Sequence, residues 1–194
     1  MTRTTGIFQR FGIGVLILLA ASGMVAPQEA HAQNSPSKEY QVKAAFLLNF
    51  LQFIEWPAAA FGNAETPITI GVLGDDPFGA ILEKTFQDEI VQGRKLMVKR
   101  SKQVEDMKAC HVVFVCKSES DHVADILTSL NDTNIVTIGE IDGFAGRGGI
   151  INFYFDDKKL RFEINPTAAQ RKGLKISSQL LKRAKIVASD QGKR

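Results

Sequence analysis

The longest run of apolar positions at helical spacing lies between residues 38 and 56, and it predicts a helix that Pro57 ends. At about 100° per residue, one side of this helix carries five apolar side chains, namely Val42, Phe46, Phe50, Phe53 and Trp56. Three more widen the apolar arc to about 220°, roughly twice the arc of an ordinary surface helix, namely Leu47, Leu51 and Ile54. The pattern therefore predicts a helix that is buried on two sides or that keeps part of its arc free for a partner.

Apolar segments of strand length alternate with helical segments after this helix. Strands are predicted over residues 67–74, 95–100, 111–116 and 134–139. The second of these strands alternates apolar and basic residues, as an edge strand does. Helical segments are predicted over residues 75–92, 104–108 and 121–131. Gly93 is expected to close the first of them. This alternation predicts parallel strands with helices on the faces of the sheet.

A β-hairpin is predicted after a glycine-rich loop at residues 143–149. Its strands would cover residues 150–155 and 159–164, and the polar turn at residues 156–158 joins them. These strands would add an antiparallel part to the same sheet.

Two helices are predicted after the hairpin. Asn165 is expected to cap the first helix, with the following proline at its first position, and Gly173 ends it. Ser177 or Ser178 is expected to cap a last helix that runs through Val187. Together these elements predict a single-domain α/β sandwich with a largely parallel sheet, an antiparallel C-terminal hairpin and flanking helices.

The predicted domain covers residues 38–188, between a polar leader at residues 33–37 and a polar tail at residues 189–194. The first 32 residues have the three parts of a secretory signal peptide: a basic head with two arginines, an apolar middle at residues 11–21, and an Ala-His-Ala end. The apolar middle is shorter than the roughly 20 residues that span a bilayer. We therefore expect cleavage after residue 32 and an exported protein, with an uncleaved membrane anchor as the alternative.

Charge and cysteine content narrow the class of partner. The formal net charge is +3 and falls to about +2 without the signal peptide, so no nucleic-acid partner is expected. If Cys110 and Cys116 lie on one strand, about 20 Å separates them, more than the roughly 7 Å that a disulfide spans, so an intramolecular disulfide is not expected unless the segment is not a strand. Two buried free thiols are therefore favoured, and an intermolecular disulfide is the alternative.

Motifs for catalysis and metal binding are weak throughout the chain. Gly71 and Gly74 lie at a strand end where doubly wound folds bind phosphate, but the glycine fingerprint is incomplete, and Asp75 with Asp76 would repel a phosphate. The remaining histidines lack the spacing of a metal site, and no serine or cysteine has a nucleophile signature. We therefore expect no catalytic residue, no metal and no cofactor, and a binding protein is favoured over an enzyme.

Two sequence blocks carry the pattern of a known family. The first is YQVKAAFLLNFLQFIEWP at residues 40–57, and the second comprises GGIINF at 148–153, LRFEIN at 160–165 and LKISSQLL at 174–181. Together they resemble the YfiR family of periplasmic proteins, and the resemblance covers about residues 38–187. It implies an α/β sandwich, in agreement with the pattern above.

The resemblance implies a regulatory role in the periplasm. The best-known member of the family binds the periplasmic part of an inner-membrane diguanylate cyclase and keeps cyclic di-GMP low, and an outer-membrane lipoprotein sequesters it. By this resemblance, the expected partner is an inner-membrane diguanylate cyclase or another sensor protein, with an outer-membrane lipoprotein as a second partner. A homodimer is a further possibility. Disulfides matter in that member, whereas two cysteines cannot form two bridges here.

The candidate contact residues come from the resemblance and from the wide helix. The resemblance links Glu163 and the following short helix, with Ala169, to partner contact. The alternative for Glu163 is a surface ion pair with Arg161 or Lys159. Trp56 is a candidate contact, with a core position at the helix end as the alternative. The wide arc adds three further candidates, Leu47, Leu51 and Ile54.

Two other classes of function stay open beside the inhibitor. A small-molecule sensor or carrier without enzymatic activity would bind at the carboxyl ends of the parallel strands, near Gly74 and residues 139–149. An exported enzyme with an unrecognised site is the third hypothesis, and the missing motifs make it the weakest.

Overall fold

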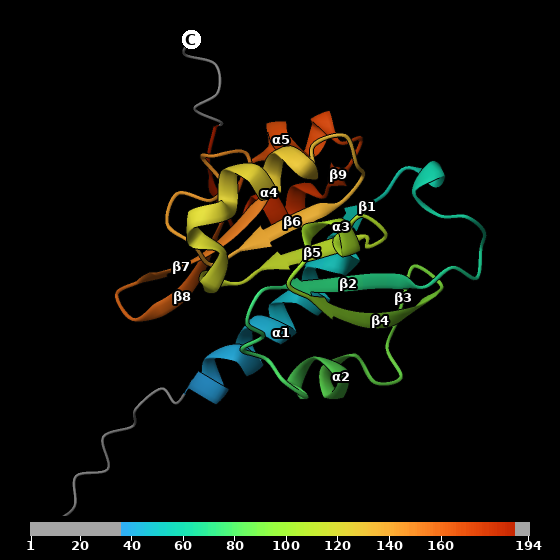
Figure 1. Cartoon of the computed structure of the whole chain (residues 1–194), viewed down its shortest axis with the longest axis horizontal. Coiled ribbons are helices and arrows are strands. Elements are labelled where there is room, and N and C mark those ends of the chain that lie inside the picture. Colours follow the sequence, from blue (N-terminus) through green and yellow to red (C-terminus); the bar gives the residue numbers. More distant parts are fainter. Residues whose placement is uncertain (1–35, 189–194) are drawn as a thin grey trace, which may run out of the picture. The chain divides into compact units, whose positions relative to one another are not determined.

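The computed structural model describes residues 36–188, which fold around one large β-sheet (Figure 1). The predicted signal peptide at residues 1–32, the first three residues of the predicted leader and the predicted tail at residues 189–194 lie outside the described residues. Within residues 36–188, no helix combines the length and the apolar character needed to cross a membrane.

The large sheet has eight strands: β2 (Ile68–Leu73), β3 (Ile90–Val91), β4 (Arg94–Ser101), β5 (Val112–Val115), β6 (Val136–Gly139), β7 (Ile151–Asp156), β8 (Lys159–Ile164) and β10 (Lys185–Ile186). Their order across the sheet is β10-β8-β7-β6-β5-β2-β4-β3. The strands from β7 to β4 pair in parallel, whereas β8 is antiparallel to β7 and β3 is antiparallel to β4. The predicted α/β class, with a largely parallel sheet and an antiparallel hairpin, is confirmed.

Helices cover both faces of this sheet. Those of the described residues are α1 (Pro36–Phe53), α2 (Ile81–Phe86), α3 (Val104–Met107), α4 (Val123–Ser129), α5 (Pro166–Arg171) and α6 (Ser178–Leu181). Side chains of α1 and α2 join one buried apolar cluster, and those of α3 and α4 join another. The two clusters are separate because side chains alternate between the two faces of each strand. Figure 1 shows α4 in front of the sheet and the hairpin β7–β8 at its left end.

Helix α1 confirms the predicted long helix, with an end at Phe53 instead of Trp56. The next two residues form β1 (Ile54–Glu55), which pairs antiparallel with β9 (Lys175–Ile176) in a separate two-stranded sheet. The last turn of the predicted helix is therefore replaced by strand pairing with a segment more than a hundred residues later in the chain.

The wide apolar arc of α1 is buried on two sides, which was one of the two predicted outcomes. Phe50 packs against Phe153 and Phe162 of the hairpin, with ring centroids 5.7 and 5.0 Å apart. Elsewhere on the arc, Leu47 and Leu51 are each 1 % exposed. Helix α1 is thus a central part of the core on its face of the sheet.

The helix predicted over residues 75–92 is wrong in length, because α2 has only six residues. The chain turns at Gly79 before α2 and at Asp88 after it, with φ of 51° and 59°. Gly93 does not close a helix, since Gln92 and Gly93, with φ of 52° and 76°, form the two-residue turn between β3 and β4. Left-handed backbone cannot belong to a right-handed helix, and apolar spacing does not reveal it.

The last predicted helix is also too long. Helix α6 has four residues, and Ser177 caps it, with its hydroxyl accepting from the backbone N of Gln179 at 3.2 Å. The chain then extends as β10, which pairs in parallel with β8, and Val187 N donates to Ile164 O at 2.9 Å. Pairing with the open edge of β8 outweighs the helical spacing of the apolar residues.

Other local predictions are confirmed. Strands β7 and β8 form the predicted hairpin, with Asp157 and Lys158 at φ of 47° and 62° in its turn. Asn165 caps α5, because its Oδ1 accepts from the backbone N of Ala168 at 3.0 Å. The helix predicted over residues 121–131 begins earlier, as a 3-10 turn at Lys117–His122, and continues as α4.

Candidate functional site

Polar side chains gather at the carboxyl ends of the parallel strands, the edge at which doubly wound α/β proteins bind ligands. Glu140 follows β6, and Asp75 and Asp76 follow β2. Two ion-pair networks form along this edge. We call them the Glu140 network (Glu39, Tyr40, Lys43 and Glu140) and the Arg100 network (Asp76, Glu83 and Arg100).

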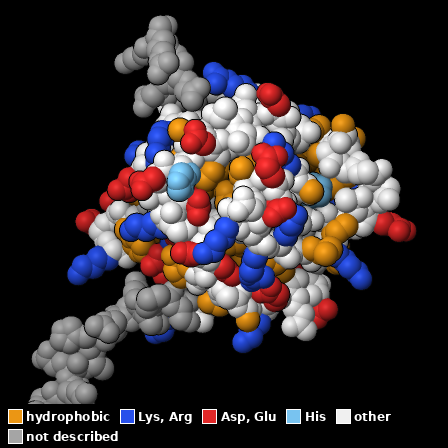
Figure 2. Space-filling view, in the orientation of Figure 1, with side chains coloured by type: hydrophobic (Ala, Val, Ile, Leu, Met, Phe, Trp, Pro, Cys, Tyr) orange, Lys and Arg blue, Asp and Glu red, His pale blue; other side chains and the backbone are white. Residues whose placement is uncertain are grey.

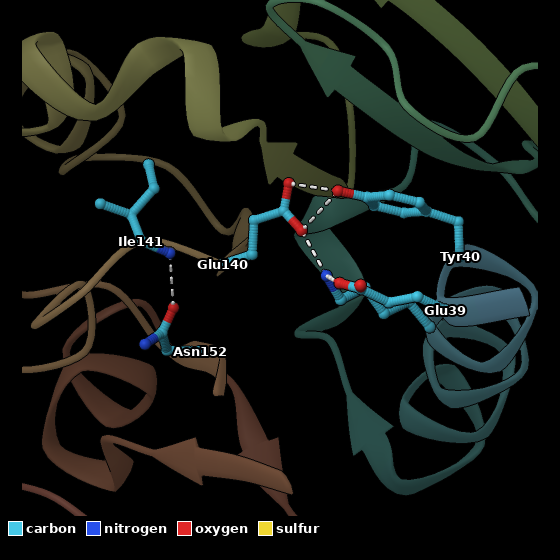
Figure 3. Close-up of polar contacts among 6 residues, drawn as sticks. Glu39, Tyr40, Glu140, Ile141 and Asn152 are labelled. Carbon is cyan, nitrogen blue, oxygen red and sulfur yellow. Dashed lines mark hydrogen bonds and ion pairs between the residues drawn. The ribbon is translucent and has the colours of Figure 1, made fainter. Parts of the chain in front are cut away.

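The Glu140 network joins the first turns of α1 to the end of β6 (Figure 3). Lys43 Nζ lies 2.5 Å from Glu140 Oε2 and also bonds the carboxylate of Glu39 one turn earlier. Tyr40 Oη donates to the carboxylate of Glu140, at 3.2 Å from Oε1 and 3.1 Å from Oε2. The side chains of Lys43 and Glu140 are only 3 % and 6 % exposed, so a buried ion pair holds α1 to the sheet.

The partners inside the Glu140 network satisfy one another. Burial, and then the negative charge of Glu140, raises the pKa of Tyr40 above its ordinary value, so the hydroxyl stays protonated and donates. The Tyr40 ring packs edge-on against Phe78 with centroids 5.1 Å apart, and Lys43 Nζ lies 4.5 Å from the Tyr40 ring centroid. Among the described residues, no buried side-chain polar atom lacks a hydrogen-bond partner. The Glu140 network therefore stabilises the packing of α1 against the sheet, and the polar groups of its side chains bond to one another instead of pointing to a ligand.

Further polar contacts run from the end of β6 to the C-terminal edge of the sheet, and Figure 3 shows the first of them, between Ile141 and Asn152. Asn152 Oδ1 accepts from the backbone N of Ile141 at 3.1 Å, and Asn152 Nδ2 donates to Glu163 Oε1 at 3.3 Å. Glu163 Oε2 lies 3.3 Å from Lys185 Nζ, so this carboxylate ties β7 and β8 to β10. Glu163 thus forms an ion pair, but its partner lies on β10 instead of on its own strand.

The other five candidate contact residues lie in the core. Four of them are 1 % exposed, namely Leu47, Leu51, Ile54 and Ala169. Trp56 is 9 % exposed, and its Nε1 donates to the backbone O of His111 at 3.2 Å, which fits the alternative of a core position. None of the five presents its side chain to a partner in this conformation. Their contact role stays a prediction, and it would require their elements to leave the core.

The Arg100 network lies at the solvent-exposed end of the carboxyl edge. Arg100 Nε donates to Asp76 Oδ2 at 2.6 Å, and its terminal nitrogens donate to the Glu83 carboxylate at 2.5 and 3.0 Å. These hydrogen bonds raise the pKa of Arg100 and lower the pKa of Glu83. Lys102 Nζ lies 2.6 Å from Asp75, so the acidic pair after β2 binds cations of this chain. Acidic and basic side chains are interspersed over the face shown in Figure 2.

The glycines near the carboxyl edge are packed against neighbouring side chains. A Cβ atom on Gly139 or Gly149 would overlap the Phe144 ring, and one on Gly74 would overlap Ser118 Oγ. Phe144 is fully buried, so its ring fills the space that the sensor hypothesis assigned to a ligand at residues 139–149. These glycines permit close packing of a side chain on the backbone.

Both cysteines are free and buried, as the favoured interpretation of the sequence predicts. Burial raises the pKa of the Cys110 and Cys116 thiols, which keeps them protonated at neutral pH and therefore poor nucleophiles. Within residues 36–188, no group of three or more His, Cys, Asp or Glu side chains is arranged to hold a metal ion.

Sequence reasoning missed the Glu140 network. The available signal was Lys43, a cation within an apolar helix and four residues after Glu39. Glu39 is itself partly exposed, so a Lys43 that is buried with its helix favours a second carboxylate from elsewhere in the chain, because a buried charge is costly unless it is well paired. The identity of that carboxylate depends on the tertiary structure, since Glu140 lies 97 residues away.

His111 was also missed as a buried polar group. Its Nδ1 accepts from the backbone N of Thr69 at 3.1 Å, and its ring stacks on Phe61 with centroids 4.5 Å apart. Burial lowers the pKa of His111, so the ring stays neutral and keeps this acceptor. The arrangement holds the segment after α1 against the amino ends of the strands, and it has no catalytic partner.

The fold and the site define an α/β protein whose carboxyl edge is closed by its own side chains. The chain belongs to the YfiR/HmsC-like family, whose model matches residues 40–185. Membership confirms the resemblance seen in the sequence. The family is one of periplasmic regulators of diguanylate cyclase signalling rather than of enzymes.

Solved structures with a similar fold include a protein from a bacterium. A conserved domain protein from Vibrio cholerae has a similar fold, with a TM-score of 0.53 and 15 % sequence identity over 76 % of this chain. The match covers 59 % of the length of that protein. At this identity the likeness concerns the fold alone. No curated protein matches the chain.

Proposed function

We propose that this protein is a periplasmic regulatory binding protein that inhibits an inner-membrane diguanylate cyclase by contact with its periplasmic part. The family match over residues 40–185 is the observation that carries this proposal. Inhibition requires only that the protein binds the inactive cyclase more tightly than the active one, because differential affinity shifts the equilibrium between the two states. Inhibition of this kind needs no catalytic site. A carboxyl edge that is filled by the Phe144 ring and by ion pairs agrees with this proposal.

We propose that the contact surface is the hairpin edge, defined as Tyr154, Phe155, Arg161, Lys185 and Ile186. Phe155 of β7 and Ile186 of β10 are 51 % and 54 % exposed, and the pairing register places both side chains on one face of the sheet. Arg161 of β8 and Lys185 of β10 are also exposed, and the pairing register places them with Tyr154 on the opposite face of these strands. Aromatic side chains and Arg are enriched among the residues that contribute most to protein–protein binding.

Glu163 has a supporting role in this proposal. Its carboxylate lies beneath the hairpin edge and holds Lys185 at 3.3 Å, which fixes β10 against β8. A substitution at Glu163 would therefore disturb the contact surface without removing a direct contact. An outer-membrane lipoprotein that competes for the hairpin edge would release the cyclase.

The test is a pull-down of the tagged full chain after cross-linking in the periplasm, with the recovered proteins identified by mass spectrometry. We expect recovery of a membrane protein with a cytoplasmic cyclase domain. Ile186→Asp should abolish this recovery, because it places a charge in the apolar part of the hairpin edge. Val42→Asp is the matched control, since Val42 is 46 % exposed on α1, outside this surface.

Three outcomes separate the parts of the proposal. Loss of the cyclase with both variants, or with neither, would contradict the hairpin edge as the contact surface. Recovery of only a second copy of this chain would show self-association instead of inhibition. Recovery of no membrane protein by a folded, exported bait would contradict the inhibitor function and favour a small-molecule sensor, which a thermal-shift screen of metabolites would reveal.

A further inference from the structure

A second open edge of the sheet lies along β4, far from the hairpin edge in the strand order. Strand β3 covers only the beginning of this edge, because it pairs with Arg94 and Lys95 alone. Over residues 96–101, the backbone hydrogen bonds within the described chain go to β2 and the turn that follows it. The outer side of β4 therefore presents backbone N–H and C=O groups without a strand partner.

The backbone pairing shows which residues of β4 face outward. Gly74 N donates to Ser101 O at 3.1 Å, so the peptide groups of Ser101 point toward β2. Because this direction alternates along a strand, the N–H and C=O groups of Leu96, Val98 and Arg100 point away from β2. These three residues could pair with an extended chain laid along the edge.

Helix α2 forms the second wall of a groove beside this edge. The hollow between α2 and the β3–β4 hairpin has a volume of about 560 Å³. Its apolar lining is Phe86, Ile90, Leu96 and Val98, and its polar rim is Glu83, Lys84, Gln87, Asp88, Glu89 and Lys95. Leu96 and Val98 are half-buried there, and Ile90 is 55 % exposed. An edge strand beside a helix suits an extended peptide, because the backbone pairs with the strand while alternate side chains enter the groove.

The opposite face of β4 has a different chemistry. Met97 and Lys99 alternate with Leu96 and Val98 along β4 and therefore lie on that other face. Lys95 follows the same alternation at the start of the strand, where it pairs with Ile90 and also borders the hollow. Met97 is 55 % exposed, and Lys99 Nζ donates to the backbone O of Asp106 instead of to a carboxylate. The ion pairs near β4 are formed by Arg100 and Lys102. Lys95 and Lys99 can therefore still form ion pairs with the carboxylates of a bound peptide.

We propose that the β4 edge binds an extended segment of a partner protein in which apolar residues alternate with acidic residues. The apolar side chains would enter the groove beside α2, and the acidic ones would meet Lys95 and Lys99 on the other face. A second copy of β4 does not fit, because residues 94–100 carry four cations and no acid, so two such strands would oppose like charges. The surface is separate from the hairpin edge and does not rest on the proposed inhibition.

The probe is a fluorescein-labelled synthetic peptide of alternating Val and Glu, and the comparison is a peptide of equal length with alternating Val and Lys. Fluorescence anisotropy with the full chain should show at least about tenfold tighter binding of the Val–Glu peptide. Val98→Pro removes an outward N–H and leaves the bonds to β2 in place, so it should weaken this binding about tenfold.

Lys95→Glu tests the charge part of the proposal on an exposed side chain that the fold does not need. It should weaken binding of the Val–Glu peptide and strengthen binding of the Val–Lys peptide. Circular dichroism and thermal unfolding check both variants, and Lys95→Glu decides alone if Val98→Pro unfolds. Equal affinity for the two peptides, no binding of either, or no effect of Lys95→Glu would overturn the proposal. Ile186→Asp should bind the Val–Glu peptide as the wild type does, which separates this test from that of the hairpin edge.

Discussion

The Glu140 network and the Arg100 network lie along the same edge of the sheet in opposite surroundings. In each network one cation lies between two carboxylates. Lys43 and Glu140 are 3 % and 6 % exposed, whereas Arg100 and Glu83 are 35 % and 50 % exposed. Removal of one partner from the ion pair should therefore affect stability differently in the two networks. Where water is excluded, losing one partner leaves a charge that cannot be solvated, and where water is present, solvent replaces the partner.

The largest effect is expected from Lys43→Ala in the Glu140 network. Removal of the ammonium leaves the buried Glu140 carboxylate without its cation, which should lower the free energy of unfolding by about 3 to 5 kcal/mol. Urea unfolding followed by circular dichroism measures this loss. The double variant with Lys43→Met and Glu140→Leu is the control and should lose less than the single variant, because it leaves no buried charge. A loss below about 1 kcal/mol for Lys43→Ala would show that water reaches this ion pair.

A smaller effect is expected from Tyr40→Phe, which removes one hydrogen bond to the Glu140 carboxylate and keeps the ring on Phe78. The loss in free energy of unfolding at neutral pH should be about 1 kcal/mol, since Tyr40 is only partly buried.

The same variant also tests how stability depends on pH. Burial raises the pKa of Tyr40 in the folded protein, whereas the unfolded chain releases this proton near its ordinary pKa of about 10. The contribution of Tyr40 is therefore fully present below about pH 10 and is lost as the pH rises above it. Urea unfolding at about pH 8 and about pH 11 should show a smaller decline for Tyr40→Phe than for the wild type. An equal decline in the free energy of unfolding for Tyr40→Phe and the wild type would show that the Tyr40 hydroxyl is exposed to solvent.

The smallest effect is expected from Glu83→Gln in the Arg100 network. Arg100 keeps Asp76 and is partly exposed, so the loss in free energy of unfolding should stay below about 1 kcal/mol. The difference from the wild type should shrink further in about 1 M salt, because salt screens exposed charges. Thermal unfolding at low and high salt measures both effects. A loss as large as that of Lys43→Ala would remove the contrast between the two networks.

The elements that periodicity and turn chemistry predicted well are those whose neighbours in sequence decide their structure. The hairpin β7–β8 and the Asn165 cap of α5 depend on contacts a few residues apart. The errors have two different sources. The β3–β4 hairpin is local, but it needs left-handed backbone at Gln92 and Gly93 that apolar spacing does not reveal, whereas β10 pairs with a segment about twenty residues earlier, β8. In both places the strand edge offers hydrogen bonds that a short helix could not match.

The candidate contacts show the same division. Leu47, Leu51 and Ile54 were expected as a contact surface because the apolar arc of α1 exceeds what a surface helix needs. The structure places them in a core that also receives the hairpin and the β1–β9 pair. Side chains exposed at the hairpin edge, such as Phe155 and Ile186, were not singled out, since a single apolar residue in a strand pattern does not show which side is covered.

The sequence by itself determined the fold class and the family, because these follow from local periodicity and from residue patterns along the chain. Only the tertiary structure decided which apolar residues stay exposed and which ion pairs are buried. Lys43 and Glu140 are 97 residues apart, and Glu163 meets Lys185 only after β10 joins the sheet. Whether water is excluded from an ion pair depends on how distant segments pack together. This exclusion makes the Lys43–Glu140 pair important for stability, whereas solvent can replace a partner in the exposed Arg100–Glu83 pair.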